Sequence, residues 1–298
     1  MDAYFLNRDV AKLNEIPMSE VLENKIFAND RFDDKVHNKL IIKNSTFATM
    51  GFKDNSFKDC KFNYCTFINC YFRNAKFIDV EFIGCNFFDC NFEGTSYNNC
   101  DFRYAKFKDC FINYDDFKCC LPKEENIRRK LCMNLSIESL KSGLEGEYKK
   151  YYFEEMDATE KYNYEIFLRR QHYYKNKYSG WDAFLALIRI IIGKINKCLW
   201  GYGEKLITLV NNIFFILLIF SILYCLFGEV FLFNGNDIPS KLSFFDSFYL
   251  SICKFTNISS DITSKVSYVR HFFIAEGVLG LILMGFFITA LYRNINRR

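Results

Sequence analysis

The sequence has few of the residues and motifs on which enzymes depend. Histidine occurs three times, at widely separated positions (His37, His172 and His271). No nucleophile motif, phosphate-binding loop or metal-ligand spacing is present. The adjacent pair Cys119-Cys120 has neither the spacing of a zinc site nor that of a redox motif. We therefore expect that the protein is not an enzyme and that it uses no metal or other cofactor.

A strong charge of one sign is also missing, and the first residues lack the pattern of a secretory signal. The net charge of +4, from 39 Lys and Arg against 35 Asp and Glu, gives no reason to expect nucleic acid as a partner. Residues 1–14 carry scattered charges and no apolar core, so we expect no secretory signal there. Without one, the 13 cysteines are interpreted as reduced cytosolic thiols that serve as small buried apolar groups, and not as a disulfide framework.

Phenylalanine is abundant, and much of it follows a five-residue repeat. From Phe47 to Phe107 every fifth residue is Phe, except that Tyr97 replaces one member. Ile112 and Phe117 continue the register, and Phe27 and Phe32 are already in phase with it. Two residues before most of these aromatics lies a small side chain, and two residues after them Asp or Asn recurs. Seven cysteines occupy the small position: Cys60, Cys65, Cys70, Cys85, Cys90, Cys100 and Cys110.

A period of five fits neither an α-helix nor a β-strand. It fits a chain that turns a corner every five residues, with the aromatic and the small side chain both pointing inward. Coils stacked at strand spacing, roughly 4.8 Å apart, would then form ladders of Phe on Phe and Cys on Cys. The predicted core contains Phe57, Phe62, Phe67, Phe72, Phe77, Phe82, Phe87, Cys60, Cys65, Cys70, Cys85 and Cys90. Because the ends of stacked repeats need protection, we expect residues 1–41 to form an N-terminal cap on a repeat domain at 42–120.

This pattern resembles the pentapeptide-repeat family, which implies a right-handed quadrilateral β-helix. Some proteins of this type imitate DNA through an acidic surface. Between Ile42 and Phe117, seven Lys and two Arg stand against eight Asp and two Glu, so the surface is nearly neutral and DNA mimicry is not expected. The β-helix is interpreted as a scaffold or rod to which a cytosolic protein or a ligand binds.

The repeat is followed by two segments of helical pattern. Pro122 breaks the register, and apolar residues at three- and four-residue spacings predict a cytoplasmic helical linker over 121–180. Residues 181–205 are assigned to an interfacial helix and elbow, with a buried soluble helix as the alternative. An apolar stretch with interspersed Arg and Lys and a Trp at each end is typical of the membrane interface. Gly201-Tyr202-Gly203 would then turn the chain into the membrane.

Two segments, 206–228 and 272–292, are long and apolar enough to cross a bilayer. Basic residues precede the first segment and follow the second: Lys194, Lys197, Lys205, Arg293, Arg297 and Arg298. The positive-inside rule therefore predicts that both termini, and the β-helix with them, are cytoplasmic. We expect a multi-pass protein of the plasma (inner) membrane, in contact with membrane lipid.

A third apolar segment, 244–255, is too short to cross and suits a re-entrant helix. The stretch FFDSFYLSICKFT resembles the pore helix of potassium-channel-like proteins, and EGVLGLILMGFFITALYRNINRR resembles their pore-lining helix. GYGEKLITLV resembles the lead into the first span of bacterial proteins that join pentapeptide repeats to this module. The resemblance implies a bacterial protein with a two-span pore module at 206–298 that assembles as a homo-oligomer, a tetramer. It also implies supporting roles for Asp246, Glu276 and Gly280, although Glu276 could instead line the ion path.

The predicted filter departs from that family. Its signature Thr-Thr-Val-Gly-Tyr-Gly-Asp aligns with Thr256, Asn257, Ile258, Ser259, Ser260 and Asp261, which lack both glycines and one residue. Glycines supply the backbone angles of a potassium filter, and Lys254 would repel cations if it faced the pore. We therefore expect either a less selective pore lined by hydroxyls or a pore module that no longer conducts.

Three functions follow from these patterns. The leading one is an oligomeric ion-channel-like membrane protein with a degenerate filter, assembled or regulated through its cytoplasmic β-helix. A membrane-anchored scaffold whose β-helix recruits a cytosolic partner is the first alternative. The second is an effector that depolarises the membrane, for instance in anti-phage defence.

Overall fold

The computed structural model describes residues 21–31, 35–227, 230–233, 236–237 and 242–296. The chain divides into two compact units, Met1–Arg189 and Ile190–Arg298, and each is described by itself. The first unit contains the repeat and helices α1–α4, and the second contains α6–α8 with a small sheet. Helix α5 (Gly180–Trp200) begins in the first unit and ends in the second.

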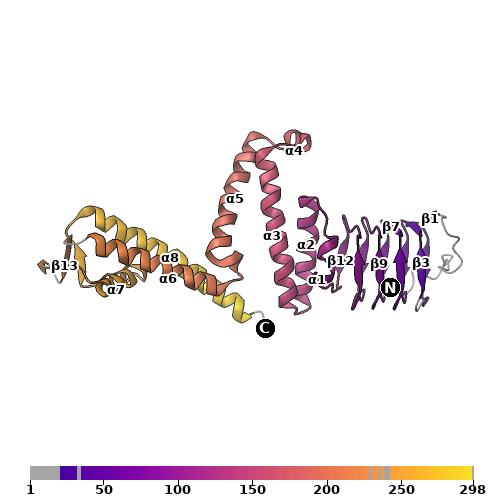
Figure 1. Ribbon diagram of the computed structural model, residues 1–298, viewed down its shortest axis with the longest axis horizontal. Helices are drawn as coiled ribbons and strands as arrows, with labels where there is room; N and C mark the ends of the chain where they lie inside the picture. The colour runs from indigo at the N-terminus through magenta and orange to yellow at the C-terminus, as the bar shows by residue number, and fades with distance from the viewer. Residues whose placement is uncertain (1–20, 32–34, 228–229, 234–235, 238–241, 297–298) are drawn as a thin grey trace, which may run out of the picture. The chain divides into compact units, whose positions relative to one another are not determined.

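The repeat folds into a β-solenoid of about four turns (Figure 1). Its strands pair in parallel with a register of twenty residues, as Phe47 with Phe67 and Phe67 with Phe87. Because the chain turns every five residues, each coil has four faces. The strands are β1 (Val21–Glu23), β2 (Ile26–Ala28), β3 (Val36–Asn38), β4 (Ile41–Lys43), β5 (Thr46–Ala48), β6 (Ser56–Lys58), β7 (Lys61–Asn63), β8 (Thr66–Ile68), β9 (Lys76–Ile78), β10 (Asn86–Phe88), β11 (Ser96–Asn98) and β12 (Lys106–Lys108).

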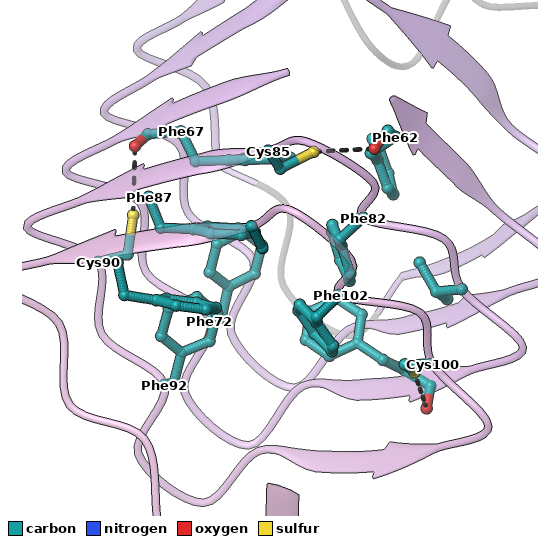
Figure 2. Close-up of a cluster of buried hydrophobic side chains, with 14 of the residues drawn as sticks. Phe62, Phe67, Phe72, Phe82, Cys85, Phe87, Cys90, Phe92, Cys100 and Phe102 are labelled. Carbon is teal, nitrogen blue, oxygen red and sulfur yellow. Dashed lines mark hydrogen bonds between the residues drawn. The ribbon is translucent and has the colours of Figure 1, made fainter. Parts of the chain in front are cut away.

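The aromatic ladders predicted from the repeat fill the interior of the solenoid. Figure 2 shows Phe62, Phe82 and Phe102, whose ring centroids are 5.4 and 5.0 Å apart and whose planes are nearly parallel. Rings on adjoining faces meet edge to face instead, as Phe82 and Phe87 do at 5.6 Å. Both arrangements are favourable for aromatic pairs. Every predicted core residue is buried, with at most 4% of its surface exposed.

The small inward position is occupied mostly by cysteines, which do more than fill space. The thiol of Cys85 donates to the Phe62 carbonyl at 2.8 Å, and that of Cys90 donates to the Phe67 carbonyl at 3.6 Å (Figure 2). All 13 cysteines are free thiols. Burial raises the pKa of Cys60, which keeps that side chain a neutral donor. The interpretation of the cysteines as apolar groups therefore omitted a weak hydrogen bond to the coil below.

The recurring Asp or Asn has a backbone cause. These residues lie at the corners, where φ is positive, for example 54° at Asp59 and 52° at Asn69. Asn, Asp and Gly adopt this left-handed conformation most readily, and Gly84 and Gly94 occupy equivalent corners. Some corner side chains also bond between coils, as Asn74 does to Asp54 at 3.0 Å.

The solenoid begins and ends earlier than the sequence predicted. Strands β1–β3 lie inside the segment assigned to the cap and pair in register with β4–β6, so the boundary at residue 42 is too late. Residues 1–20 of the predicted cap lie outside the described residues. At the other end, helix α1 (Tyr114–Phe117) and a 3₁₀ turn, η2 (Lys118–Cys120), replace further coils.

A helical hairpin covers the last coil. It consists of α2 (Glu125–Lys141) and α3 (Glu145–Leu168), which run side by side, with α4 (His172–Lys177) after them (Figure 1). The Asn134 amide accepts from the Phe107 N–H at 2.7 Å and donates to the Phe107 carbonyl at 2.8 Å. Glu138 accepts from the Asp109 N–H at 2.7 Å. These side chains satisfy backbone groups that the next coil would otherwise pair.

In the second unit, two long helices lie side by side, α6 (Leu206–Phe227) and α8 (Ser267–Asn296) (Figure 1). Among the described helices, α6 and residues Ser267–Ile295 of α8 are long and apolar enough to cross a membrane. Between them come β13 (Phe231–Phe233), β14 (Asn236–Asp237), α7 (Phe244–Phe255) and β15 (Ile262–Ser264). The three strands form an antiparallel sheet in the order β14-β13-β15, which the sequence analysis missed.

A substitution at one exposed corner isolates the cost of its backbone conformation. Asn69 has φ 52° and, within the described part of the chain, none of the side-chain bonds that join other corners. We expect Asn69→Val to destabilise the neighbouring coils by roughly 1–2 kcal/mol, because a β-branched residue tolerates positive φ poorly. Hydrogen-exchange protection of residues 66–72 in the full chain measures this effect. Asn69→Gly is the matched control, and equal protection in the two variants would contradict the explanation.

Candidate functional site

Helix α7 packs against both α6 and α8, and its two faces differ in burial. Ser247, Leu250 and Ser251 are fully buried on the inner face, whereas Phe245 and Tyr249 are exposed on the outer one. Asp246 lies exposed in the first turn, where a carboxylate suits the helix dipole. The structure thus places Asp246 at the opposite end of α7 from the other predicted site residues.

The loop between α7 and β15 (Thr256–Asp261), the predicted filter, begins with a helix-ending motif. The Ile258 N–H bonds to the Cys253 carbonyl at 2.8 Å, and the Asn257 N–H bonds to the Lys254 carbonyl at 3.2 Å. Asn257 has φ 56°, the left-handed conformation that ends such a motif. The first residues of this loop therefore close the helix. The side chains of Ile258, Ser259 and Asp261 are exposed.

Lys254 is turned toward the loop that follows it. Its ammonium group donates to the Ser260 hydroxyl at 2.9 Å and lies 4.8 Å from the centre of the Phe273 ring. Ser260 in turn donates to the Ile262 carbonyl at 2.9 Å. The lysine therefore connects the end of α7 to the loop and to α8.

Glu276 joins the three helices of the second unit. Its side chain is fully buried, and one carboxylate oxygen accepts from the Tyr224 hydroxyl of α6 at 2.5 Å. The other oxygen accepts from the Ser251 hydroxyl of α7. The Ser251 hydroxyl also lies 3.2 Å from the Leu217 carbonyl of α6. A buried carboxylate requires such donors. Tyr224 and Ser251 were not among the predicted site residues, because hydroxyl groups in apolar segments give no signal of their partner.

Two glycines let α8 approach the end of α7. A Cβ atom at Gly280 would collide with the Phe255 carbonyl, and one at Gly277 would lie 2.7 Å from the Asn257 side-chain oxygen. The Asn257 amide also donates to the Gly277 carbonyl at 3.2 Å. Gly280 was predicted as a support residue, whereas Gly277 was missed.

The elbow between α5 and α6 is a left-handed turn. Gly201, Tyr202 and Gly203, the residues of turn η3, have φ values of 56°, 57° and 88°. Next to it, the buried Glu204 carboxylate accepts from Arg293 at 3.2 Å, which connects the elbow to the last turns of α8. Neither residue was predicted as part of a site, because they are 89 positions apart.

The polar residues of α6 divide between two uses. The Asn212 amide donates to the Cys198 and Leu199 carbonyls at 2.9 Å, so it joins α6 to the end of α5. The Ser221 hydroxyl instead donates to the Leu217 carbonyl of its own helix.

Removal of the Glu276 carboxylate tests its part in joining the helices. In Glu276→Leu the Tyr224 hydroxyl loses its acceptor in a buried site, which costs about 1–3 kcal/mol. We therefore expect a lower unfolding temperature of the purified protein in detergent. Glu276→Gln keeps the shape and one acceptor oxygen, so its loss should be smaller. Equal stability of Glu276→Leu and the unmodified protein would contradict this role.

The elbow can be tested with one alanine substitution. At Gly203, with φ 88°, an added Cβ would lie 2.5 Å from an Arg293 guanidinium nitrogen, so Gly203→Ala should expose the elbow to hydrogen exchange. Gly193→Ala in α5 is the matched control, because no described atom beyond its chain neighbours and the nearby backbone of its own helix lies within 4 Å of its added Cβ. There alanine should stabilise the helix by up to about 1 kcal/mol. The same response in both variants would rule out the close approach as the cause.

The comparisons with known proteins concern the first unit. The profile of the family described as pentapeptide repeats matches residues 56–94 and 81–113, with eight copies. No curated protein matches the sequence. Among solved structures, the chain is similar to a trypsin-treated form of QnrB1, a plasmid-mediated fluoroquinolone resistance protein. The identity is 17% and the TM-score 0.18, over 32% of this chain and 57% of that chain, so the match spans little more than half of QnrB1. Residues 56–113 are therefore pentapeptide repeats, and they fold as a β-solenoid.

Proposed function

We propose that the protein is a subunit of a homo-oligomeric ion channel of the plasma membrane, in which four copies of α6–α8 surround a pore. The observation that carries the proposal is the short helix α7, held between two long apolar helices by a buried polar group. The number of copies follows from the resemblance of this segment to potassium-channel-like proteins.

The apolar surfaces of α6 and α8 support a membrane setting. In the most apolar 18-residue stretch of α6 only 11% is buried within the chain, and in that of α8 only 22% is buried. Large side chains such as Ile207 and Leu281 are more than 70% exposed. Exposing this apolar surface to water would be unfavourable, whereas lipid and neighbouring copies of the chain would cover it.

Helix α7, with twelve residues, is too short to cross a bilayer and needs protein around it at membrane depth. The contacts with Glu276, Gly277 and Gly280 supply that support from α8. We place α7 as a re-entrant helix whose carboxyl end points toward the shared axis.

The loop after α7 supports a pore without potassium selectivity. A potassium filter needs stacked rings of backbone carbonyls, and its glycines supply the backbone angles for them, but this loop has Ser259 and Ser260 where that family has Gly-Tyr-Gly. The exposed side chains of Ser259 and Asp261 would then line the pore mouth. Four copies of Asp261 would attract cations without distinguishing strongly among them.

The proposed orientation places the solenoid and both termini in the cytoplasm. Lys194, Lys197 and Lys205 precede α6, and Arg293 lies in the last turn of α8. Helix α5 has an exposed apolar stripe that suits a position in the headgroup region: Trp181, Phe184, Ile188, Ile191, Ile192 and Ile195.

Ion flux through liposomes that contain the purified full chain tests this function. We expect flux of potassium and sodium at similar rates and little flux of chloride. In Ile258→Cys, where the side chain is 60% exposed in the loop, a cationic thiol reagent should block the flux.

Two controls accompany the measurement. Ile222→Cys carries its thiol on the exposed face of α6 and should leave flux unblocked, and the unmodified protein accounts for the native cysteines. The absence of flux for every ion, from a protein shown to be inserted and tetrameric, would contradict a channel and favour the membrane-anchored scaffold.

A further inference from the structure

A cavity of about 610 Å³ lies in the first unit, where the last coil of the solenoid meets helix α2. Strands β10 and β12 form one wall, and residues 126–141 of α2 form the other. Its volume falls within the range of small-molecule sites. The pentapeptide repeats do not account for it, because the wall formed by α2 lies outside them.

The cavity follows from the way the solenoid ends. Coils stack at strand spacing, roughly 4.8 Å, whereas a helix with its side chains is about 10 Å across. Helix α2 contacts β12 through Asn134 and Glu138, which bond to the Phe107 and Asp109 backbone. It cannot follow the whole strand surface as another coil would, and a hollow remains beside these bonds.

Lysines stand on both walls of the cavity. Lys106 and Lys108 come from β12, and Lys130 and Lys141 come from α2. The one carboxylate among the lining residues, Glu138, is already bonded to Lys141 at 2.7 Å. The side-chain ammonium groups of the other three lysines have no ion-pair or hydrogen-bond partner among the described residues, so the cavity carries a local excess of positive charge.

Between the lysines the lining is mostly apolar and includes aromatic rings. Phe88 lies on β10, and Tyr104, which is 63% exposed, lies at the corner before β12. An exposed ring beside a basic wall suits a flat ring system attached to an anionic group, since the ring stacks while the lysines bind the charge. The Asn126 amide, also in the lining, can bond to the edge of such a ring.

We propose that this cavity binds a small anionic ligand with a flat apolar body, the chemistry of a nucleoside phosphate. Lys106, Lys108 and Lys130 bind the phosphate groups, and Tyr104 contacts the base. The proposal concerns the first unit alone and holds whether or not the second unit conducts ions.

Titration calorimetry of the full chain in lipid nanodiscs, with ATP as the probe, tests the proposal. We expect ATP to bind, AMP to bind more weakly, and uncharged adenosine to bind at least about tenfold more weakly than ATP, because the charges account for much of the affinity. Rising salt should weaken ATP binding. Pyrophosphate should also bind more weakly than ATP, because it lacks the ring.

Two double variants locate the site. Lys106→Ala with Lys130→Ala should weaken ATP binding about tenfold or more. Lys58→Ala with Lys76→Ala removes two exposed lysines from another face of the solenoid, and binding should stay the same. No binding of ATP, equal binding of ATP and adenosine, equal binding of ATP and pyrophosphate, or equal effects of the two double variants would each overturn the proposal.

Discussion

Every fifth residue of the solenoid turns a corner in the left-handed region of backbone space, and the first unit depends on that corner. It holds successive strands at a register of twenty residues, so each aromatic ring lies above the ring of the coil before. The same regularity leaves unpaired backbone groups at the last coil. Helix α2 satisfies them with the side chains of Asn134 and Glu138. The corner therefore determines the core, the exposed edge and the need for a helix that covers it.

The second unit uses a different principle, a polar group buried among apolar helices. The Glu276 carboxylate of α8 accepts a hydrogen bond from a hydroxyl of α6 and from one of α7, so it connects all three helices. Close packing at Gly277 and Gly280 brings α7 against α8 at the same level. Hydrogen bonds depend strongly on distance and angle. The bonds to this carboxylate therefore specify the relative positions of the helices more narrowly than apolar contacts among Leu, Ile and Phe do. The position of the α7–β15 loop follows from them.

Both proposals concern places where one kind of regular structure stops. The loop after α7 begins where a helix ends on a left-handed Asn257, and the cavity lies where stacked coils give way to α2. At such places backbone groups and side chains are not all used by the repeat or the helix. Ser259 and Asp261 are exposed in the loop, and Lys106 and Lys130 are exposed beside the cavity. The regular parts position these residues.

The sequence by itself determined the features that depend on local repetition. The five-residue period predicted the solenoid and its Phe and Cys core, because inward-facing positions recur at fixed spacing along the chain. The long apolar runs predicted α6 and α8, because a helix that crosses a bilayer needs about 20 apolar residues. Only the tertiary structure decided which distant residues meet. Tyr224 with Glu276, Arg293 with Glu204, and β13 with β15 are pairs far apart in sequence, and no local pattern marks them. The cavity beside α2 arose in the same way, since it depends on the mismatch in size between a coil and a helix, which no residue spacing records.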